Sequence, residues 1–273
     1  TDPKLNKQHA LLRLRPDIQA LQKSGTGRER VVFLLDTSRS ESPKRFALNM
    51  ELLEKTLKAS TGTKKFNVIT FDAGARWFSK TWLNNDAAGR KAFIEGMKGV
   101  LLEGGTDLSA ALRALANPPM TLDKVAGSKI PVDVMLLSDG AVNWGIRDLD
   151  AMLARYKAST PWNDRIFAYR TGLGAENLPL YQALTKRGAI FNCMSQAALD
   201  KCATAHLNAG MLLTKVEVVP ATAKDTKPGA MSDVLVSGRL ATLFPGAALT
   251  IAGVVDKPGD VIVKLSGHVG DKT

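Results

Sequence analysis

Short apolar runs alternate with amphipathic stretches along most of the chain. The runs VVFLLD at 31–36, FNVITFD at 66–72 and VDVMLLSDG at 132–140 are nearly continuously apolar, which is typical of strands covered on both faces of a parallel sheet. From Pro43 to Leu57 the apolar residues instead recur at helical spacing. Strands that alternate with helices predict an α/β fold with a mainly parallel sheet flanked by helices.

The same alternation continues further along the chain. A short strand at 76–79 is expected to pair with the run at 66–72, and a helix is expected around Phe93. Another helix begins after Asp107 and ends before Asn117–Pro118. The remaining predicted elements are helices at about 148–157, 177–187 and 196–208 and strands at 165–170 and 189–192.

After about residue 211 the pattern changes to short runs of period two. The runs VLVSGRL, ALTIAGVV and DVIVKLSG are separated by Pro245–Gly246 and Pro258–Gly259, which predicts antiparallel hairpins. We therefore divide the chain into an N-terminal extension (1–28), an α/β domain (29–210) and a β-rich module (211–273). Residues 1–28, or sequence outside this chain, are expected to complete the β module.

Composition narrows the class of protein. The 273 residues are 45% hydrophobic and 23% charged, as in ordinary globular domains. No stretch of about 18 apolar residues occurs, so no membrane span is expected in this sequence. The formal charge of +11 favours anionic partners. However, the lysines and arginines are dispersed and accompany no nucleic-acid-binding motif, so nucleic-acid binding is not expected.

The two cysteines, Cys193 and Cys202, leave two interpretations open. They could pair in a disulfide, which would favour an exported protein. They could equally be two reduced, buried thiols that pack as small apolar side chains.

Three clusters of acidic and hydroxyl residues lie at predicted strand ends or helix starts. They are Asp36-Thr37-Ser38-Arg39-Ser40, Gly104-Gly105-Thr106-Asp107 and Ser138-Asp139-Gly140. The carboxyl ends of parallel strands share one edge of a sheet, where ligands bind at a switch in strand order. We therefore expect the three clusters to converge.

These residue types suit a hard cation such as Mg²⁺, which takes oxygen ligands. Asp36 and Asp139 supply charge, while the hydroxyls of Ser38, Ser40 and Thr106 supply neutral oxygens. With so few charged ligands, the ion would keep an open position that a carboxylate of a partner protein can fill. Each cluster alone also has an ordinary interpretation, as a turn or a helix cap; their joint occurrence carries the prediction.

With these residues the sequence resembles the von Willebrand factor A domain family over roughly residues 29–210. Asp36, Ser38 and Ser40 match the DxSxS motif of its metal-ion-dependent adhesion site, Thr106 matches the threonine loop and Asp139 matches the acidic residue of SDG. The resemblance implies a doubly wound sheet, a bound Mg²⁺ (or Mn²⁺ or Ca²⁺) and a partner protein bound at the metal. It also implies a domain without enzymatic activity.

The tail carries a second resemblance. The stretch from Leu212 through LFPGAALTIAG is similar to the region after the A domain in inter-alpha-trypsin inhibitor heavy-chain-like proteins, in which a VIT domain precedes the A domain. Most of a VIT domain is absent from this sequence. The chain is therefore expected to be part of a larger protein.

Two residues beside the motifs are candidates for partner binding. Arg39 replaces the small residue usual at that position of DxSxS and could hold an acidic ligand by charge-assisted hydrogen bonds, or point into solvent. Trp144 follows Asp139-Gly140 and is either part of the core or an exposed aromatic anchor.

The leading functional hypothesis is a metal-dependent protein-binding module for adhesion or assembly, located extracellularly, at the cell surface or in the periplasm. The alternative is a structural scaffold module whose metal site serves stability only. A metal-dependent hydrolase is a third class, for which Asp107 is the candidate general base.

Overall fold

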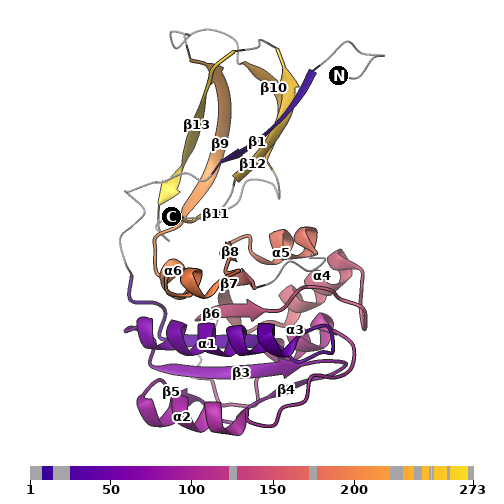
Figure 1. The fold of residues 1–273 in the computed structure, drawn as a ribbon, viewed down its shortest axis with the longest axis vertical. Helices are drawn as coiled ribbons and strands as arrows, with labels where there is room; N and C mark the ends of the chain where they lie inside the picture. Colours follow the sequence, from indigo (N-terminus) through magenta and orange to yellow (C-terminus); the bar gives the residue numbers. More distant parts are fainter. Residues whose placement is uncertain are drawn as a thin grey trace. The chain divides into compact units, whose positions relative to one another are not determined.

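The computed structural model describes residues 8–14, 25–122, 128–171, 177–221, 230–236, 242–245, 247, 249–256 and 259–269. The chain divides into two compact units (Figure 1). One is an α/β unit, Ser24–Leu207, and the other is a β unit that combines the N-terminal segment up to Lys23 with Asn208 onward. We describe each unit by itself.

The α/β unit is built on one seven-stranded sheet with the order β4-β3-β2-β6-β7-β8, and β5 pairs separately with β3. The strands are β2 (Arg30–Asp36), β3 (Lys65–Phe71), β4 (Ala75–Trp77), β5 (Leu83–Asn84), β6 (Ile130–Leu137), β7 (Trp162–Arg170) and β8 (Ile190–Asn192). All pairings from β3 to β8 are parallel, and only β4 and β5 join antiparallel. The predicted α/β class and mainly parallel sheet are confirmed.

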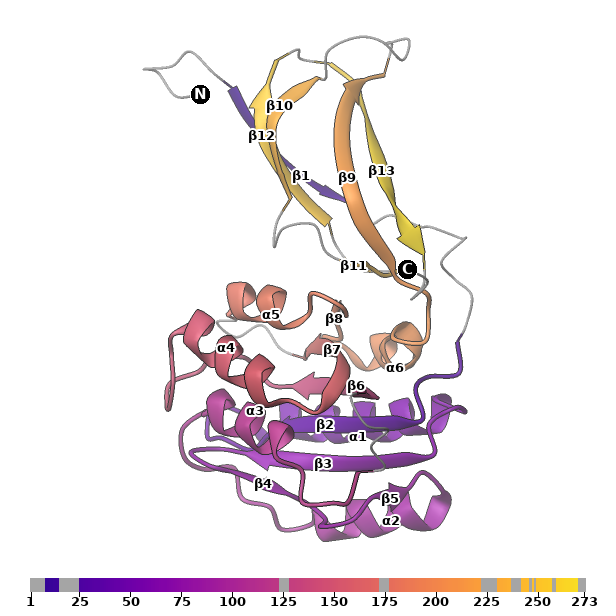
Figure 2. The ribbon, with the colours of Figure 1, turned by 180° about the vertical axis from the view of Figure 1, so that it is seen from behind.

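Helices cover both faces of this sheet. They are α1 (Pro43–Ala59), α2 (Ala87–Gly96), α3 (Leu108–Ala116), α4 (Leu149–Ser159), α5 (Leu178–Leu184) and α6 (Leu199–Ala205), which follows a short 3₁₀ turn at Gln196–Ala198. Figures 1 and 2 show α1 and α6 on one face and α3 and α4 on the other. Side-chain oxygens cap the first turns of α1 through α4, from Ser42, Asp86, Asp107 and Asp148.

The strands bury both of their faces. Val32 and Leu34 of β2 belong to a cluster that includes apolar side chains of α3, α4 and α5. Their neighbours Phe33 and Leu35, also buried, alternate to the other face. Because both faces of β2 are buried, its sequence from Val31 to Leu35 is continuously apolar.

The order of the strands sets the position of the candidate site. From β2 the chain passes through α1 to β3 on one side, and it later returns through α3 to β6 on the other side. The carboxyl end of β2 therefore lies at a switch point of a doubly wound sheet, where such folds bind ligands.

The β unit consists of two three-stranded antiparallel sheets, β1-β12-β10 and β11-β9-β13. The strands are β1 (Gln8–Leu14), β9 (Met211–Pro220), β10 (Met231–Val236), β11 (Thr242–Leu243), β12 (Leu249–Val255) and β13 (Val261–Val269). The antiparallel tail is confirmed, and β1 pairs with β12 along its whole length. Two of the predicted turn residues, Gly246 and Pro258, and part of the run at 234–240 lie outside the described residues.

Both cysteines are free and buried. Cys202 Sγ lies 3.3 Å from the carbonyl oxygen of Asn192, and the proximity of Cys202 raises the pKa of the Cys193 thiol. Within the described part of the chain, no helix is long and apolar enough to span a membrane.

A buried polar network interrupts the α1/α6 face of the sheet. Asp133 of β6 is 1% exposed and accepts two hydrogen bonds from Arg165, with N···O distances of 2.8 and 2.9 Å. Arg28 adds an ion pair to the same carboxylate. His206, which is 2% exposed, lies 3.0 Å from Ser60 Oγ through Nε2. The apolar run around Asp133 concealed this network at the level of sequence.

His206 predicts a pH dependence of stability. Burial lowers the pKa of His206 from 6.5 to about 4, so the unfolded chain binds more protons between these values. The contribution of His206 to the free energy of unfolding, about 3 kcal/mol, is fully present above pH 6.5 and is lost as the pH falls through 4. All four tryptophans lie in the α/β unit, so tryptophan fluorescence during urea unfolding measures this unit. His206→Gln should flatten the dependence, whereas His268→Gln on the exposed end of β13 should leave it unchanged.

Candidate metal centre

The first loop of the site begins at Asp36, the last residue of β2. The Ser38 amide donates to Asp36 Oδ1 at 2.9 Å, which closes a tight turn. Two backbone hydrogen bonds tie this loop to the glycine-rich loop: Arg39 N to Gly104 O at 3.2 Å and Glu103 N to Thr37 O at 3.0 Å. The first two clusters predicted from sequence are therefore in direct contact.

Three hydroxyl oxygens from these two loops form a triangle. The Ser38 and Thr106 oxygens are 2.8 Å apart, those of Ser38 and Ser40 are 3.0 Å apart, and those of Ser40 and Thr106 are 3.4 Å apart. In an octahedral Mg²⁺ site with bonds of about 2.05 Å, neighbouring ligand oxygens are about 2.9 Å apart. The hydroxyls thus have nearly the spacing of one face of such an octahedron.

Asp36 is fully buried beside this triangle. Ser138 Oγ donates to Asp36 Oδ2 at 2.6 Å, so the third cluster fixes the carboxylate of the first. Burial nevertheless raises the pKa of Asp36, against the lowering effect of the hydrogen bonds from Ser138 and Ser38. Because burial destabilises the ionised form of this carboxylate, a nearby positive charge would stabilise it.

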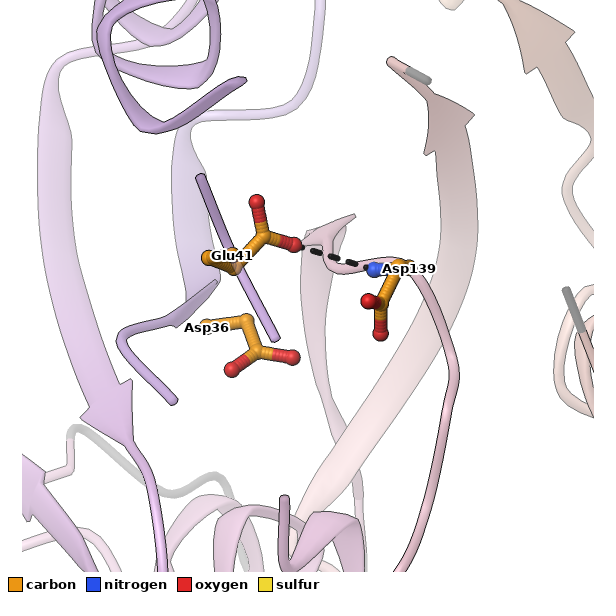
Figure 3. A group of neighbouring side chains, drawn as sticks. All are labelled: Asp36, Glu41 and Asp139. Atoms are coloured by element: carbon orange, nitrogen blue, oxygen red, sulfur yellow. Dashed lines mark hydrogen bonds between the residues drawn. The ribbon is translucent and has the colours of Figure 1, made fainter. Parts of the chain in front are cut away.

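Asp139 and Glu41 complete a cluster of three carboxylates, in which ligand oxygens of Asp36, Glu41 and Asp139 lie within 4.8 Å of one another. The Asp139 amide donates to Glu41 Oε1 at 3.1 Å, the dashed line in Figure 3. Arg45 lies 3.1 Å from Asp139 Oδ2 and 3.9 Å from Glu41 Oε2. Among the described residues this arginine is the one cation that forms an ion pair with the cluster.

Glu41 is the least satisfied member. Its side chain is fully buried, and its Oε2 atom has no hydrogen-bond partner. Burial first, and then the charge of Asp36, raise the pKa of Glu41 to about 8. An uncompensated buried acid of this kind is a place where a bound cation adds stability.

The threonine loop is held from its far side. The Thr106 amide donates to Asn143 Oδ1 at 2.7 Å, and the Trp144 amide donates to Thr106 O at 3.2 Å. Gly104 has a φ of 74°, which a residue with a side chain rarely adopts.

Asp107 caps α3, accepting from Ala110 N at 2.9 Å and from Ser109 Oγ at 2.5 Å, so its ordinary interpretation as a helix cap is confirmed.

The structure brings the predicted ligands Asp36, Ser38, Ser40, Thr106 and Asp139 to one edge of the sheet. Arg39 is exposed beside them and its side chain makes no ion pair among the described residues. Trp144 is 60% exposed, so its interpretation as a core residue is wrong.

Three residues of this centre were not predicted from the sequence: Glu41, Arg45 and Asn143. The first two are four positions apart around Pro43, a spacing that suggests an ion pair. Nothing in that spacing shows that both turn inward to Asp139. The roles of Ser138 and Asn143 depend on contacts with distant loops.

Comparison with known proteins agrees with this geometry. Residues 31–141 match the family model of the von Willebrand factor type A domain. This part of the α/β unit is therefore similar to a von Willebrand factor type A domain. The match ends before the β unit, so the similarity of the tail to VIT-containing proteins stays a prediction. No curated protein matches the chain.

Solved structures resemble the chain in fold. A von Willebrand factor type A protein from Catenulispora acidiphila is 18% identical, with a TM-score of 0.51 over 97% of this chain and 67% of that one. An aerotolerance-related membrane protein from Bacteroides fragilis is also 18% identical, with a TM-score of 0.48 over 65% and 96%. Proximal thread matrix protein 1 from the mussel byssus, with a zinc-occupied MIDAS motif, is 14% identical, with a TM-score of 0.44 over 73% and 48%.

The α/β unit should change its stability with pH through Glu41. In metal-free protein with EDTA, the raised pKa means that a stabilising contribution is present below pH 4.5 and is lost as the pH rises through about 8. Glu41→Gln removes this loss, so the variant should have the higher Tm at pH 9 and a smaller advantage at pH 5. Differential scanning calorimetry measures both. Glu103→Gln, on the exposed adjacent loop, should behave as wild type, and a wild-type profile for Glu41→Gln would contradict this assignment.

Proposed function

We propose that the A domain binds another protein through a divalent cation held by Asp36, Ser38, Ser40, Thr106 and Asp139. The observation that carries the proposal is the triangle of three hydroxyl oxygens between the two carboxylates. The three neutral hydroxyl oxygens lie 2.8–3.4 Å apart, next to the buried carboxylate of Asp36. This combination of ligands suits a hard metal ion. Glu41 Oε2, which is buried and has no hydrogen-bond partner, also supports the binding of a cation here.

A Mg²⁺, Mn²⁺ or Ca²⁺ ion at this position would supply a positive charge that can accept a carboxylate oxygen from a partner. The residues of the chain position that ion. Asp36 and Ser138 fix the buried side, whereas Ser40 and Arg39 are exposed and leave the solvent side accessible. The partner class is therefore a protein with an exposed aspartate or glutamate.

Arg39 and Trp144 are proposed to contact the partner beside the metal. Arg39 presents a cation for a charge-assisted hydrogen bond to the acidic ligand. Trp144 presents a large, rigid apolar surface of the kind found at interface hot spots. Its backbone is bonded to the threonine loop, so it is fixed relative to the ligating hydroxyl of Thr106.

We further propose an exported location: extracellular, at the cell surface or periplasmic. The contact between the Cys193 and Cys202 thiols supports this, since a pair in contact can form a disulfide in an oxidising compartment.

The alternative is a scaffold module in which the ion serves stability only. The three carboxylates with a single arginine favour a stabilising role for a cation, which linkage would convert into a higher Tm. A hydrolytic role has less support, because the carboxylate of Asp107 is occupied as the cap of α3. We therefore propose a domain that is not an enzyme.

The metal site is tested by calorimetric titration with Mg²⁺ and Mn²⁺. Wild type should bind one ion and gain thermal stability. Ser38→Ala or Asp36→Ala should weaken binding by about tenfold or more while far-UV circular dichroism stays unchanged. Ser195→Ala, which removes an exposed hydroxyl far from the site in sequence, is the matched control and should bind as wild type. Absence of binding to the wild type would overturn the proposal.

The partner role is tested with an immobilised peptide library that contains aspartate or glutamate, in Mg²⁺ and with EDTA. Retention should require the metal. Arg39→Ala should lower it and reduce its salt dependence, while Trp144→Ala should lower it without changing that dependence. Lys91→Ala, an exposed cation on α2, is the control. Normal metal binding with equal retention in EDTA would favour the scaffold alternative.

A further inference from the structure

A concave site lies in the α/β unit, at the opposite edge of the sheet from the candidate metal centre. Its cavity of about 310 Å³ is bounded by α4, the first half of β7 and the end of α5, elements that are neighbours in Figure 2. The volume is at the lower end of the range for small-molecule pockets. Because its strand residues, Trp162–Ile166, begin β7, the cavity lies at the amino edge of the sheet. The metal centre lies at the carboxyl edge.

The inner wall of this cavity is apolar. Leu153, Trp162, Ile166 and Leu184 all line it, and each is less than a tenth exposed. Trp162 is fixed by a hydrogen bond from Nε1 to the carbonyl oxygen of Leu115 at 2.7 Å. A wall held in this way is ready to pack against the flat or aliphatic body of a ligand.

Four cations surround this wall: Lys129, Lys157, Lys186 and Arg187. They come from three separate places in the chain, just before β6, on α4 and just after α5, and all four are exposed. The lysines and arginines are dispersed in the sequence, and the fold gathers these four. Cations that the fold brings together repel one another, and an anionic ligand relieves that repulsion.

The one acidic group among the lining residues, Asp164, leaves an excess of positive charge beside the four cations. Asp164 accepts a hydrogen bond from Tyr156 Oη at 2.8 Å. Burial raises the pKa of Tyr156, so its hydroxyl stays protonated and keeps donating to Asp164. Lys157 and Lys129 make no hydrogen bond or ion pair with any residue that the structure describes.

We propose that this pocket binds a small organic anion whose apolar body packs on the Trp162 wall and whose carboxylate or phosphate group meets the lysines. The ligand class follows from the combination of the two surfaces. An inorganic anion would leave the apolar wall uncovered, and a neutral ligand would leave Lys129 and Lys157 without a counter-charge among the described residues. The site is independent of the metal centre and of the function proposed for it.

The test is calorimetric titration of the whole chain in EDTA with 1-naphthyl phosphate and 1-naphthoate. At least one should bind about tenfold more tightly than both 1-naphthol and inorganic phosphate. The tighter of the two identifies the anionic group. If neither exceeds 1-naphthol and inorganic phosphate, the proposal is overturned.

Variants locate the binding. Lys157→Glu reverses one rim charge on the surface of α4 and should weaken the preferred probe about tenfold. Ala183→Leu, which fills the cavity without changing charge, should weaken it as well. Lys91→Glu makes the same charge change on α2 and should bind as wild type. Equal affinity in Lys157→Glu and wild type, or an equal loss in Lys91→Glu, would overturn the assignment to this pocket.

Discussion

The candidate metal centre depends on a concentration of buried acidic groups where β2 and β6 end. Asp36, Glu41 and Asp139 lie within 4.8 Å of one another, and Arg45 is the cation paired with them among the described residues. Burial is the largest cause of the raised pKa of Asp36 and of Glu41, and the neighbouring carboxylates raise both pKa values further. A cluster of this kind is stable either with protons or with a metal ion. The adjacent hydroxyls favour the metal, because they provide neutral oxygens at the spacing of an octahedral face.

The sheet makes this concentration possible. Parallel pairing of β3, β2 and β6 aligns their carboxyl ends. The loops that follow β2 and β6 lead to α1 and α4, which lie on opposite faces of the sheet, so these two loops turn to opposite faces. Apolar burial on both faces then holds the strands in register. The loops therefore carry a backbone conformation that needs glycine, at Gly104, and a buried acid, Glu41, on a scaffold that keeps them in position.

The sequence predicted the elements whose patterns are local. The sequence was sufficient to place Asp36 at a strand end, because Asp36 closes the apolar run at 31–36. The convergence of the hydroxyl residues followed from the parallel topology. Asp133 shows where this reasoning stops. It lies inside an apolar run, and its partners Arg28 and Arg165 are distant in sequence. The inward direction of Glu41 and the exposure of Trp144 likewise depend on tertiary packing, which no short period in the sequence encodes.

The hydrogen bonds among Ser38, Ser40 and Thr106 also bear on how the affinity of the site is set. These hydroxyls already have nearly the separation that an octahedral ion requires, so binding needs little movement of the two loops. An ion would replace weak hydroxyl–hydroxyl bonds, which cost little to break in a partly exposed position. The larger change occurs at Asp139, whose carboxylate is paired with Arg45 at 3.1 Å. An ion that draws on this carboxylate competes with the guanidinium, which can retain its contact with Glu41. If the proposed function holds, Arg45 and Glu41, rather than the motif hydroxyls, are therefore the residues that tune the affinity for the cation.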